Sequence, residues 1–164
     1  MIQVATRDGD VGRHITLEIE MNTLMTVEPP KLKPELIDIP RFQDARGTLA
    51  VMEFTDDLPF KPVRQFVVTG VPAGAVRGQH AHKKLQELLI CARGSFSVTL
   101  DDGRSRITVP LDAKGPALHL RSLVWASQHD FSEDAVLVVL ASRHFETDDY
   151  IRDYDTFLKM RRGM

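Results

Sequence analysis

The chain has 164 residues, 43% of them hydrophobic and 27% charged, which is typical of one globular domain with its own core. Its 21 lysines and arginines are scattered among 23 acidic residues, so no basic patch indicates a nucleic-acid partner. Apolar runs are too short to span a membrane, and residues 1–4 lack the start of a signal peptide. The single cysteine, Cys91, excludes an intrachain disulfide and fits a reducing compartment. We therefore expect a cytoplasmic protein without membrane or nucleic-acid partners.

The chain divides into an N-terminal arm, residues 1–35, and a folded domain, residues 36–164. The arm holds one possible strand, 14–20, and a proline-bearing stretch at 27–34, and we consider its exchange between the subunits of a dimer. From residue 36 onward, short apolar stretches alternate with turn residues, which predicts a β-sandwich or β-barrel. The predicted strands are 49–54, 64–69, 86–92, 95–100, 106–111 and 135–141.

The clearest local signal is a β-hairpin in residues 96–103. Alternating apolar residues lead there into Asp102-Gly103, a pair that favours the positive φ angles of a tight hairpin turn. After Glu146 the pattern changes again: acidic residues come first, apolar residues recur at Ile151, Tyr154 and Leu158, and basic residues follow. This order suits the helix dipole, and we predict a C-terminal helix.

Two histidines, His80 and His82, are the strongest candidates for a functional site. They are two positions apart, so on a β-strand both imidazoles lie on one face and can act on one ligand. Glycines precede the pair and an apolar stretch follows it. The pair therefore lies where a turn enters a buried strand, a common place for functional residues.

The surroundings of this pair are similar to a known metal motif. With Gly74, Glu87 and Gly94, the spacing resembles the first motif of the cupin superfamily, in which two histidines and a glutamate bind a divalent ion. A later strand normally supplies one more histidine. The residue after Trp125 is Ala126, so a further ligand would be His119 or His129.

Further motifs occur along residues 36–158. They are Asp44-Ala45-Arg46-Gly47, Arg77-Gly78-Gln79-His80-Ala81-His82-Lys83, Gly94-Ser95-Phe96, Leu100-Asp101-Asp102-Gly103, Val124-Trp125, His129-Asp130-Phe131-Ser132, Val139-Leu140-Ala141-Ser142 and Asp149-Tyr150-Ile151-Arg152-Asp153-Tyr154-Asp155. Through these motifs the chain resembles the nucleotide-sugar 3,4-ketoisomerases, a family of the cupin superfamily. The resemblance implies an all-β cupin barrel, also called a double-stranded β-helix or jelly roll, with a C-terminal α-helix, and a homodimer.

The same resemblance implies an enzyme without a cofactor. It would move the keto group between C4 and C3 of a dTDP-linked 4-keto-6-deoxy sugar, through an enediol, in deoxyamino-sugar biosynthesis. His80 and His82 would be the acid/base pair, since the ordinary pKa of imidazole lies close to neutral pH.

Four other residues are candidates for binding this substrate. Arg77 would hold the anionic nucleotide sugar or the enediolate. Arg46 would contact the diphosphate, although an ion pair with Asp44 is an equally good reading. Lys83 would neutralise phosphate and Trp125 would stack on a base or sugar, but a solvated lysine and a core tryptophan are the more common roles.

Two departures from the family pattern bear on activity. Phe66 and Val67 offer no hydroxyl where isomerases usually carry a tyrosine, and Glu87 stands where the family commonly has glutamine. A buried carboxylate needs a cation or a protonated histidine beside it. Two alternatives therefore stay open: a metal-dependent cupin enzyme with a divalent metal on His80, His82 and Glu87, and a non-catalytic cupin that binds a nucleotide sugar.

Overall fold

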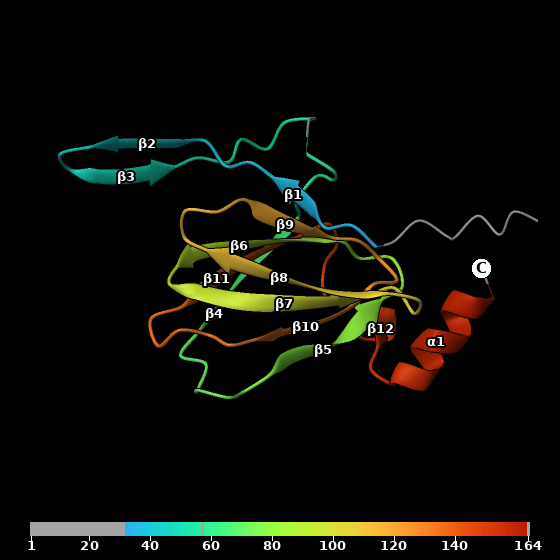
Figure 1. Ribbon diagram of the computed structural model, residues 1–164. Coiled ribbons are helices and arrows are strands. Elements are labelled where there is room, and N and C mark those ends of the chain that lie inside the picture. The colour runs from blue at the N-terminus through green and yellow to red at the C-terminus, as the bar shows by residue number, and fades with distance from the viewer. Residues whose placement is uncertain (1–31, 57, 164) are drawn as a thin grey trace, which may run out of the picture. The chain divides into compact units, whose positions relative to one another are not determined.

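The computed structural model describes residues 32–56 and 58–163. Two five-stranded antiparallel sheets pack against each other around one hydrophobic core, and a helix follows at the C-terminus (Figure 1). In spatial order the first sheet contains β1 (Glu35–Ile37), β9 (Ala117–Leu120), β6 (Glu87–Arg93), β11 (Val136–Ala141) and β4 (Arg64–Thr69). The second contains β12 (Tyr150–Ile151), β5 (Arg77–His82), β10 (Trp125–His129), β7 (Ser95–Asp101) and β8 (Arg106–Asp112). This is the predicted all-β architecture with a C-terminal helix.

Five of the predicted strands, from 64–69 to 135–141, are present with ends that differ by at most one residue. The predicted hairpin joins β7 and β8, where Gly103 has a φ of 84° and its N–H donates to the Asp101 carboxylate at 2.7 Å. Pro110 lies inside β8, which is possible because β8 is an edge strand and one side of its backbone needs no ladder partner.

The core lies between the two sheets. Along β7 the residues Phe96, Val98 and Leu100 alternate with more exposed ones and point into the core. From the opposite sheet, Leu89 and Leu137 pack into the same cluster. Apolar side chains from both sheets are thus buried between them, which is the main favourable term in forming the barrel.

The C-terminal helix α1 (Tyr154–Arg162) begins later than the pattern after Glu146 indicates. The residues before it form a 3-10 turn, η1 (Thr147–Asp149), and then strand β12, in which Tyr150 and Ile151 pair with β5. Ile151 is buried in this position, so the paired strand is favoured over an earlier helix start. The helix then starts at Asp153, whose carboxylate caps it by accepting the N–H of Thr156 at 2.8 Å.

Strands β2 (Arg41–Asp44) and β3 (Gly47–Ala50) form a separate two-stranded sheet. The strand predicted at 49–54 is therefore wrong in its bounds: β3 begins earlier, and its pairing ends at Ala50, which lies opposite Arg41 at the start of β2. Phe42 and Leu49 pair across this hairpin and are 63% and 60% exposed. The hairpin thus presents a large apolar pair to its surroundings.

Most of the expected N-terminal arm, including the candidate strand at 14–20, lies outside the described residues. Glu35, the last residue of the expected arm, is the first residue of β1. The division of the chain into an arm and a domain after residue 35 stays a prediction. Within the described part of the chain, no helix is both long and apolar enough to cross a membrane.

Candidate active site

His80 and His82 lie at the end of β5, where this strand runs close to β10. Gly78 allows the approach: its φ is 77°, and a Cβ there would lie 2.9 Å from the carbonyl oxygen of Ala126. The register between β5 and β10 shifts at this point. His82 is 3% exposed and His80 is half-buried, so the pair stands partly inside the barrel.

The two imidazoles meet through their Nε2 atoms, which are 3.2 Å apart, with the rings nearly perpendicular at 88°. Nδ1 of His80 donates to the carbonyl oxygen of Gly78 at 2.9 Å, and Nδ1 of His82 donates to Oδ2 of Asp149 at 3.0 Å. A carbonyl and a carboxylate only accept, so these contacts assign the proton of each neutral ring to Nδ1. The two Nε2 atoms face each other, so their 3.2 Å contact is a hydrogen bond when one of them carries an additional proton, and the pair can hold and exchange one proton.

Burial keeps this pair in the free-base form. The pKa of His82 is lowered from 6.5 to about 4, chiefly by burial and next by the nearby His80, while the hydrogen bond to Asp149 opposes the change. The pKa of His80 is also lowered, chiefly by burial, and its bond to Gly78 opposes this. At neutral pH both side chains can therefore accept a proton from a bound ligand.

Two residues of the C-terminal segment complete the surroundings of the pair, and sequence reasoning assigned neither to the site. The carboxylate of Asp149 holds His82, as described above. The ring of Tyr150 lies with its centroid 4.9 Å from that of His80 and 4.3 Å from that of His82. Tyr150 lies in β12, directly opposite His82. The Asp149-Tyr150 motif, quoted above only for the resemblance, was the available signal.

Glu87 approaches the pair from the opposite sheet. Its Oε1 lies 3.9 Å from Nε2 of His82, and burial raises the pKa of the Glu87 carboxyl from 4.5 to about 7, although the charge of Arg64 opposes the rise. Arg64 and Glu87 both pair with Ala141, from either side, so the three side chains lie on the same face of the sheet.

Arg64 is a further residue that sequence reasoning missed. Its guanidinium lies over the ring of Phe66, 5.1 Å from the centroid, and 5.8 Å from that of Phe145. Its buried Nε has no hydrogen-bond partner among the described residues. Along β4, Arg64 and Phe66 are the less exposed residues, whereas Val67 is 52% exposed and points outward. Of the two positions considered for the family tyrosine, Phe66 is thus on the site's side of the strand.

The metal-binding alternative finds limited geometric support. Within residues 32–56 and 58–163, no group of three or more histidine, cysteine or acidic side chains is arranged to hold a metal ion. His119 bonds Gln86 and Glu35, and His129 bonds Thr99, so neither completes a shell with His80 and His82.

Three of the four predicted substrate-binding residues lie on or next to β5 and β10. Arg77 is exposed at the start of β5, and Nζ of Lys83 donates to the main-chain oxygen of Asp148 at 2.6 Å. Trp125 packs on the aromatic rings of Tyr154 and Phe157 under the C-terminal helix. Their roles in binding stay predictions.

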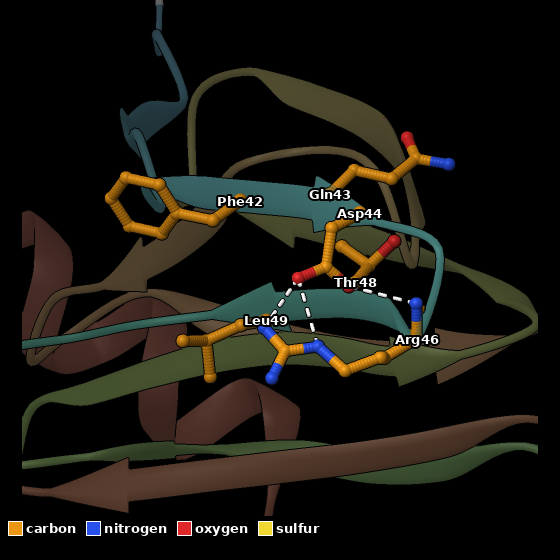
Figure 2. A pocket seen from close by; sticks show the side chains of 7 residues that line it. Phe42, Gln43, Asp44, Arg46, Thr48 and Leu49 are labelled. Carbon is orange, nitrogen blue, oxygen red and sulfur yellow. Dashed lines mark hydrogen bonds and ion pairs between the residues drawn. The ribbon is translucent and has the colours of Figure 1, made fainter.

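Arg46 lies in the turn of the β2–β3 hairpin. It bonds Asp44 through its side chain and its main-chain N–H (Figure 2). A pocket on this hairpin is lined by Phe42, Gln43, Asp44, Arg46, Gly47, Thr48 and Leu49, and it contains neither histidine of the pair. The ion pair considered as the alternative for Arg46 is present, and the diphosphate contact stays a prediction.

Known proteins are similar to this chain in sequence and in fold. The FdtA family model, described as WxcM-like, C-terminal, matches residues 32–162. The TDP-4-oxo-6-deoxy-alpha-D-glucose-3,4-oxoisomerase of Aneurinibacillus thermoaerophilus is 38% identical over 128 residues, which cover 78% of this chain and 92% of that protein.

Solved structures give the same result. QdtA, a sugar 3,4-ketoisomerase from Thermoanaerobacterium thermosaccharolyticum in complex with TDP, is similar with a TM-score of 0.76 and 35% identity over 79% of this chain and 95% of that one. A 3,4-ketoisomerase from Helicobacter canadensis has a TM-score of 0.75 and 33% identity, covering 80% and 98% of the two chains. With the histidine pair inside an antiparallel barrel, these matches show that the chain belongs to the FdtA (WxcM-like, C-terminal) family of cupin-like sugar-nucleotide 3,4-ketoisomerases.

Proposed function

We propose that this protein moves the keto group between C4 and C3 of a dTDP-linked 4-keto-6-deoxy sugar, with His80 and His82 as acid/base catalysts and no metal ion. The observation that carries this proposal is the 3.2 Å contact between the two Nε2 atoms, with each Nδ1 bound to an acceptor. Two imidazoles in direct contact can hold and exchange a proton, which suits a reaction that moves protons between adjacent carbons.

The proposed isomerisation moves one proton from C3 to C4 and one from O3 to O4. One Nε2 removes the proton from C3; the electrons of the C3–H bond form the C3=C4 double bond, and the carbonyl oxygen at C4 becomes an enediolate oxygen. The hydroxyl proton at O3 is lost while O4 gains one, and C4 then receives a proton from the imidazolium. Because the Nε2 atoms are 3.2 Å apart, a proton accepted by one ring can pass to the other before it returns to carbon.

The charge of the enediolate needs a counter-charge, since the site is largely buried. Arg64 supplies a fixed positive charge on the strand that carries Phe66, and its Nε has no partner among the described residues. A guanidinium placed where negative charge develops stabilises the transition state more than the ground state. We therefore assign Arg64 the role of stabilising the enediolate, and retain Arg77 for holding the anionic nucleotide sugar.

We also propose a cytoplasmic homodimer. Phe42 and Leu49 expose one apolar pair on the β2–β3 hairpin, and covering such a pair with a second copy removes apolar surface from water. The single cysteine fits a reducing compartment. The dimer contact through the N-terminal arm, considered above, is a separate possibility for the same assembly.

The test is proton NMR of metal-stripped protein with TDP-4-keto-6-deoxyglucose in deuterated water. We expect deuterium exchange at C3 and appearance of the 3-keto product, and loss of both in His80→Ala and in His82→Ala. His144→Ala serves as the matched control, because this histidine is exposed on the segment between β11 and η1.

Three results would contradict the proposal. Activity that returns only after a divalent metal is added favours the metal site of His80, His82 and Glu87. Thermal stabilisation by TDP without exchange favours a binding module. Full exchange in both histidine variants would remove the pair from the mechanism.

A further inference from the structure

Asp149 is a buried carboxylate with an unusual set of partners. It is the last residue of η1, directly before β12, and is 6% exposed. Its Oδ2 accepts Nδ1–H of His82 at 3.0 Å and the main-chain N–H of Leu85 at 3.2 Å, and its Oδ1 accepts the main-chain N–H of Lys84 at 2.9 Å. Three donors from one short segment therefore fix the position of this carboxylate.

We propose that Asp149 is the positioning residue of the active site: it holds His82 in the Nδ1–H tautomer and thereby keeps Nε2 of His82 available as a base. The catalytic half of this proposal rests on the proposed function above. The tautomer itself is a property of the protein without substrate and can be measured separately.

The tautomer of His82 follows from the number of protons on its ring. A neutral imidazole carries one N–H, and a proton on Nε2 would leave the Nδ1 lone pair facing a carboxylate oxygen at 3.0 Å. The main-chain bonds from Lys84 and Leu85 keep the carboxylate from turning away. The repulsion is avoided with the proton on Nδ1, which leaves Nε2 of the neutral His82 ring unprotonated, 3.2 Å from Nε2 of His80 and able to take a proton from it.

The position of Asp149 is set by the pairing of β12 with β5. Tyr150 lies opposite His82 in this ladder, and the main-chain N–H of Lys83 donates to the main-chain oxygen of Asp149 at 2.9 Å. The pairing of β12 with β5 thus holds the Asp149 carboxylate next to the strand that carries the imidazole of His82. This arrangement fixes the ring orientation as well as its tautomer, as second partners of catalytic and metal-bound histidines do.

The charged groups around His82 agree with this division of roles. His80 on β5 and Glu87 on β6 face its Nε2 side, Arg64 on β4 contributes positive charge, and Asp149 alone contacts Nδ1. When His82 becomes an imidazolium after proton abstraction, the Asp149 carboxylate is the group in direct contact that stabilises it. It touches no substrate atom and acts through His82.

The experiment compares Asp149→Asn with Asp148→Asn, a neighbouring exposed carboxylate, in the full-length protein. An asparagine has a single acceptor oxygen for the three donors. If its NH2 group takes the place of Oδ2, Nδ1 of His82 must accept and the ring proton moves to Nε2. Ring 15N NMR, with signals assigned by comparison with His82→Gln, reads the tautomer, and steady-state kinetics on TDP-4-keto-6-deoxyglucose read kcat and KM.

We expect wild-type His82 to be protonated on Nδ1, and Asp149→Asn to move the proton to Nε2. We expect kcat to fall by roughly 10- to 100-fold, as for other partners of functional histidines, while KM changes by less than about threefold. Asp148→Asn should match the wild-type protein in both measurements.

An Nε2–H tautomer in the wild-type protein overturns the proposal, and this measurement does not require the variant to fold. A folded Asp149→Asn protein with the wild-type tautomer, or with a shifted tautomer and unchanged kcat, overturns it as well. Failure of the wild-type protein to isomerise the sugar contradicts the proposed function instead, and the 15N spectra then decide the tautomer claim alone.

Discussion

The carboxylate of Glu87 and Nε2 of His82 lie 3.9 Å apart, and the two side chains are only 8% and 4% exposed. Burial pushes their pKa values in opposite directions, to about 7 for Glu87 and to about 4 for His82. Both shifts favour the neutral forms. A proton that enters this pair near neutral pH is therefore held by the carboxyl group, which leaves the imidazole free as a base.

Glu87→Gln should change the pH dependence of stability. The pKa of Glu87 is raised from 4.5 to about 7, so between these values the folded protein keeps a proton that the unfolded chain releases. This group therefore lowers stability as the pH rises through that range, by roughly 3 kcal/mol in all, and contributes no further change above it. Urea denaturation at pH 5 and pH 8 should show a smaller loss in Glu87→Gln than in the wild-type protein. The exposed carboxyl of Glu133 provides the control, Glu133→Gln, and an unchanged pH difference in Glu87→Gln would show that Glu87 is not buried as a neutral acid.

Gly78→Ala tests the approach of β5 to β10. Gly78 and Gly74 both have a φ of 77°, but a Cβ at Gly78 would lie 2.9 Å from the carbonyl oxygen of Ala126, whereas nothing lies within 4 Å at Gly74. Both alanine variants incur the cost of a positive φ, about 1 to 2 kcal/mol, and Gly78→Ala adds an overpacking cost of about 1 to 3 kcal/mol. Thermal denaturation should place Gly78→Ala well below Gly74→Ala, and its activity should fall with the displaced histidines. Equal melting temperatures would mean that the strand moves without cost.

Phe42→Asp should dissociate the proposed dimer. A charge in place of an apolar side chain cannot be buried against a second copy without a partner. Light scattering after size-exclusion chromatography should give the monomer mass for Phe42→Asp and the dimer mass for Gln43→Asp, which alters the next residue of the same strand and the opposite face of the hairpin. A dimeric Phe42→Asp protein would place the interface elsewhere.

Arg64→Gln and Arg77→Gln should affect different kinetic constants. Arg64 lies on the side of the catalytic pair and is expected to stabilise the enediolate, so its loss should lower kcat by at least about tenfold. Arg77 is exposed at the start of β5 and is expected to hold the nucleotide, so its loss should raise KM and weaken TDP binding. Arg93→Gln, which removes an exposed ion pair with Asp134, is the control and should change neither constant. An Arg64→Gln protein with normal kcat would remove this residue from the reaction.

Local patterns were enough to predict much of the fold. The strands and the β7–β8 hairpin could be predicted because alternation and Asp-Gly turns are properties of a few neighbouring residues. The same holds for His80 and His82, which share a face because they are two residues apart. The start of α1 could not be predicted in this way, since the segment around Tyr150 is helical in pattern but is stabilised as a strand by β5.

The partners of the histidines depend on the tertiary structure. Arg64, Glu87 and Asp149 lie on three different elements, and only the pairing of those elements brings them toward β5. Trp125 shows that a recognisable motif does not reveal what its side chain contacts. It was predicted to bind substrate, but in the structure it packs against Phe157 of helix α1. The residue types in a motif indicate which reaction a site can catalyse. Which side chains surround those residues depends on the order in which the strands pair.

The pairing of β5 with β12 has a consequence for synthesis of the chain. Residues 77–82 leave the ribosome long before residues 149–151, so a nascent chain that has completed β11 carries most of the core and both histidines. It lacks the acceptor for Nδ1 of His82, and that imidazole is free to take either tautomer. In the proposed mechanism, the tautomer that makes His82 a base is therefore fixed only after residues 149–151 have been synthesised and have paired with β5.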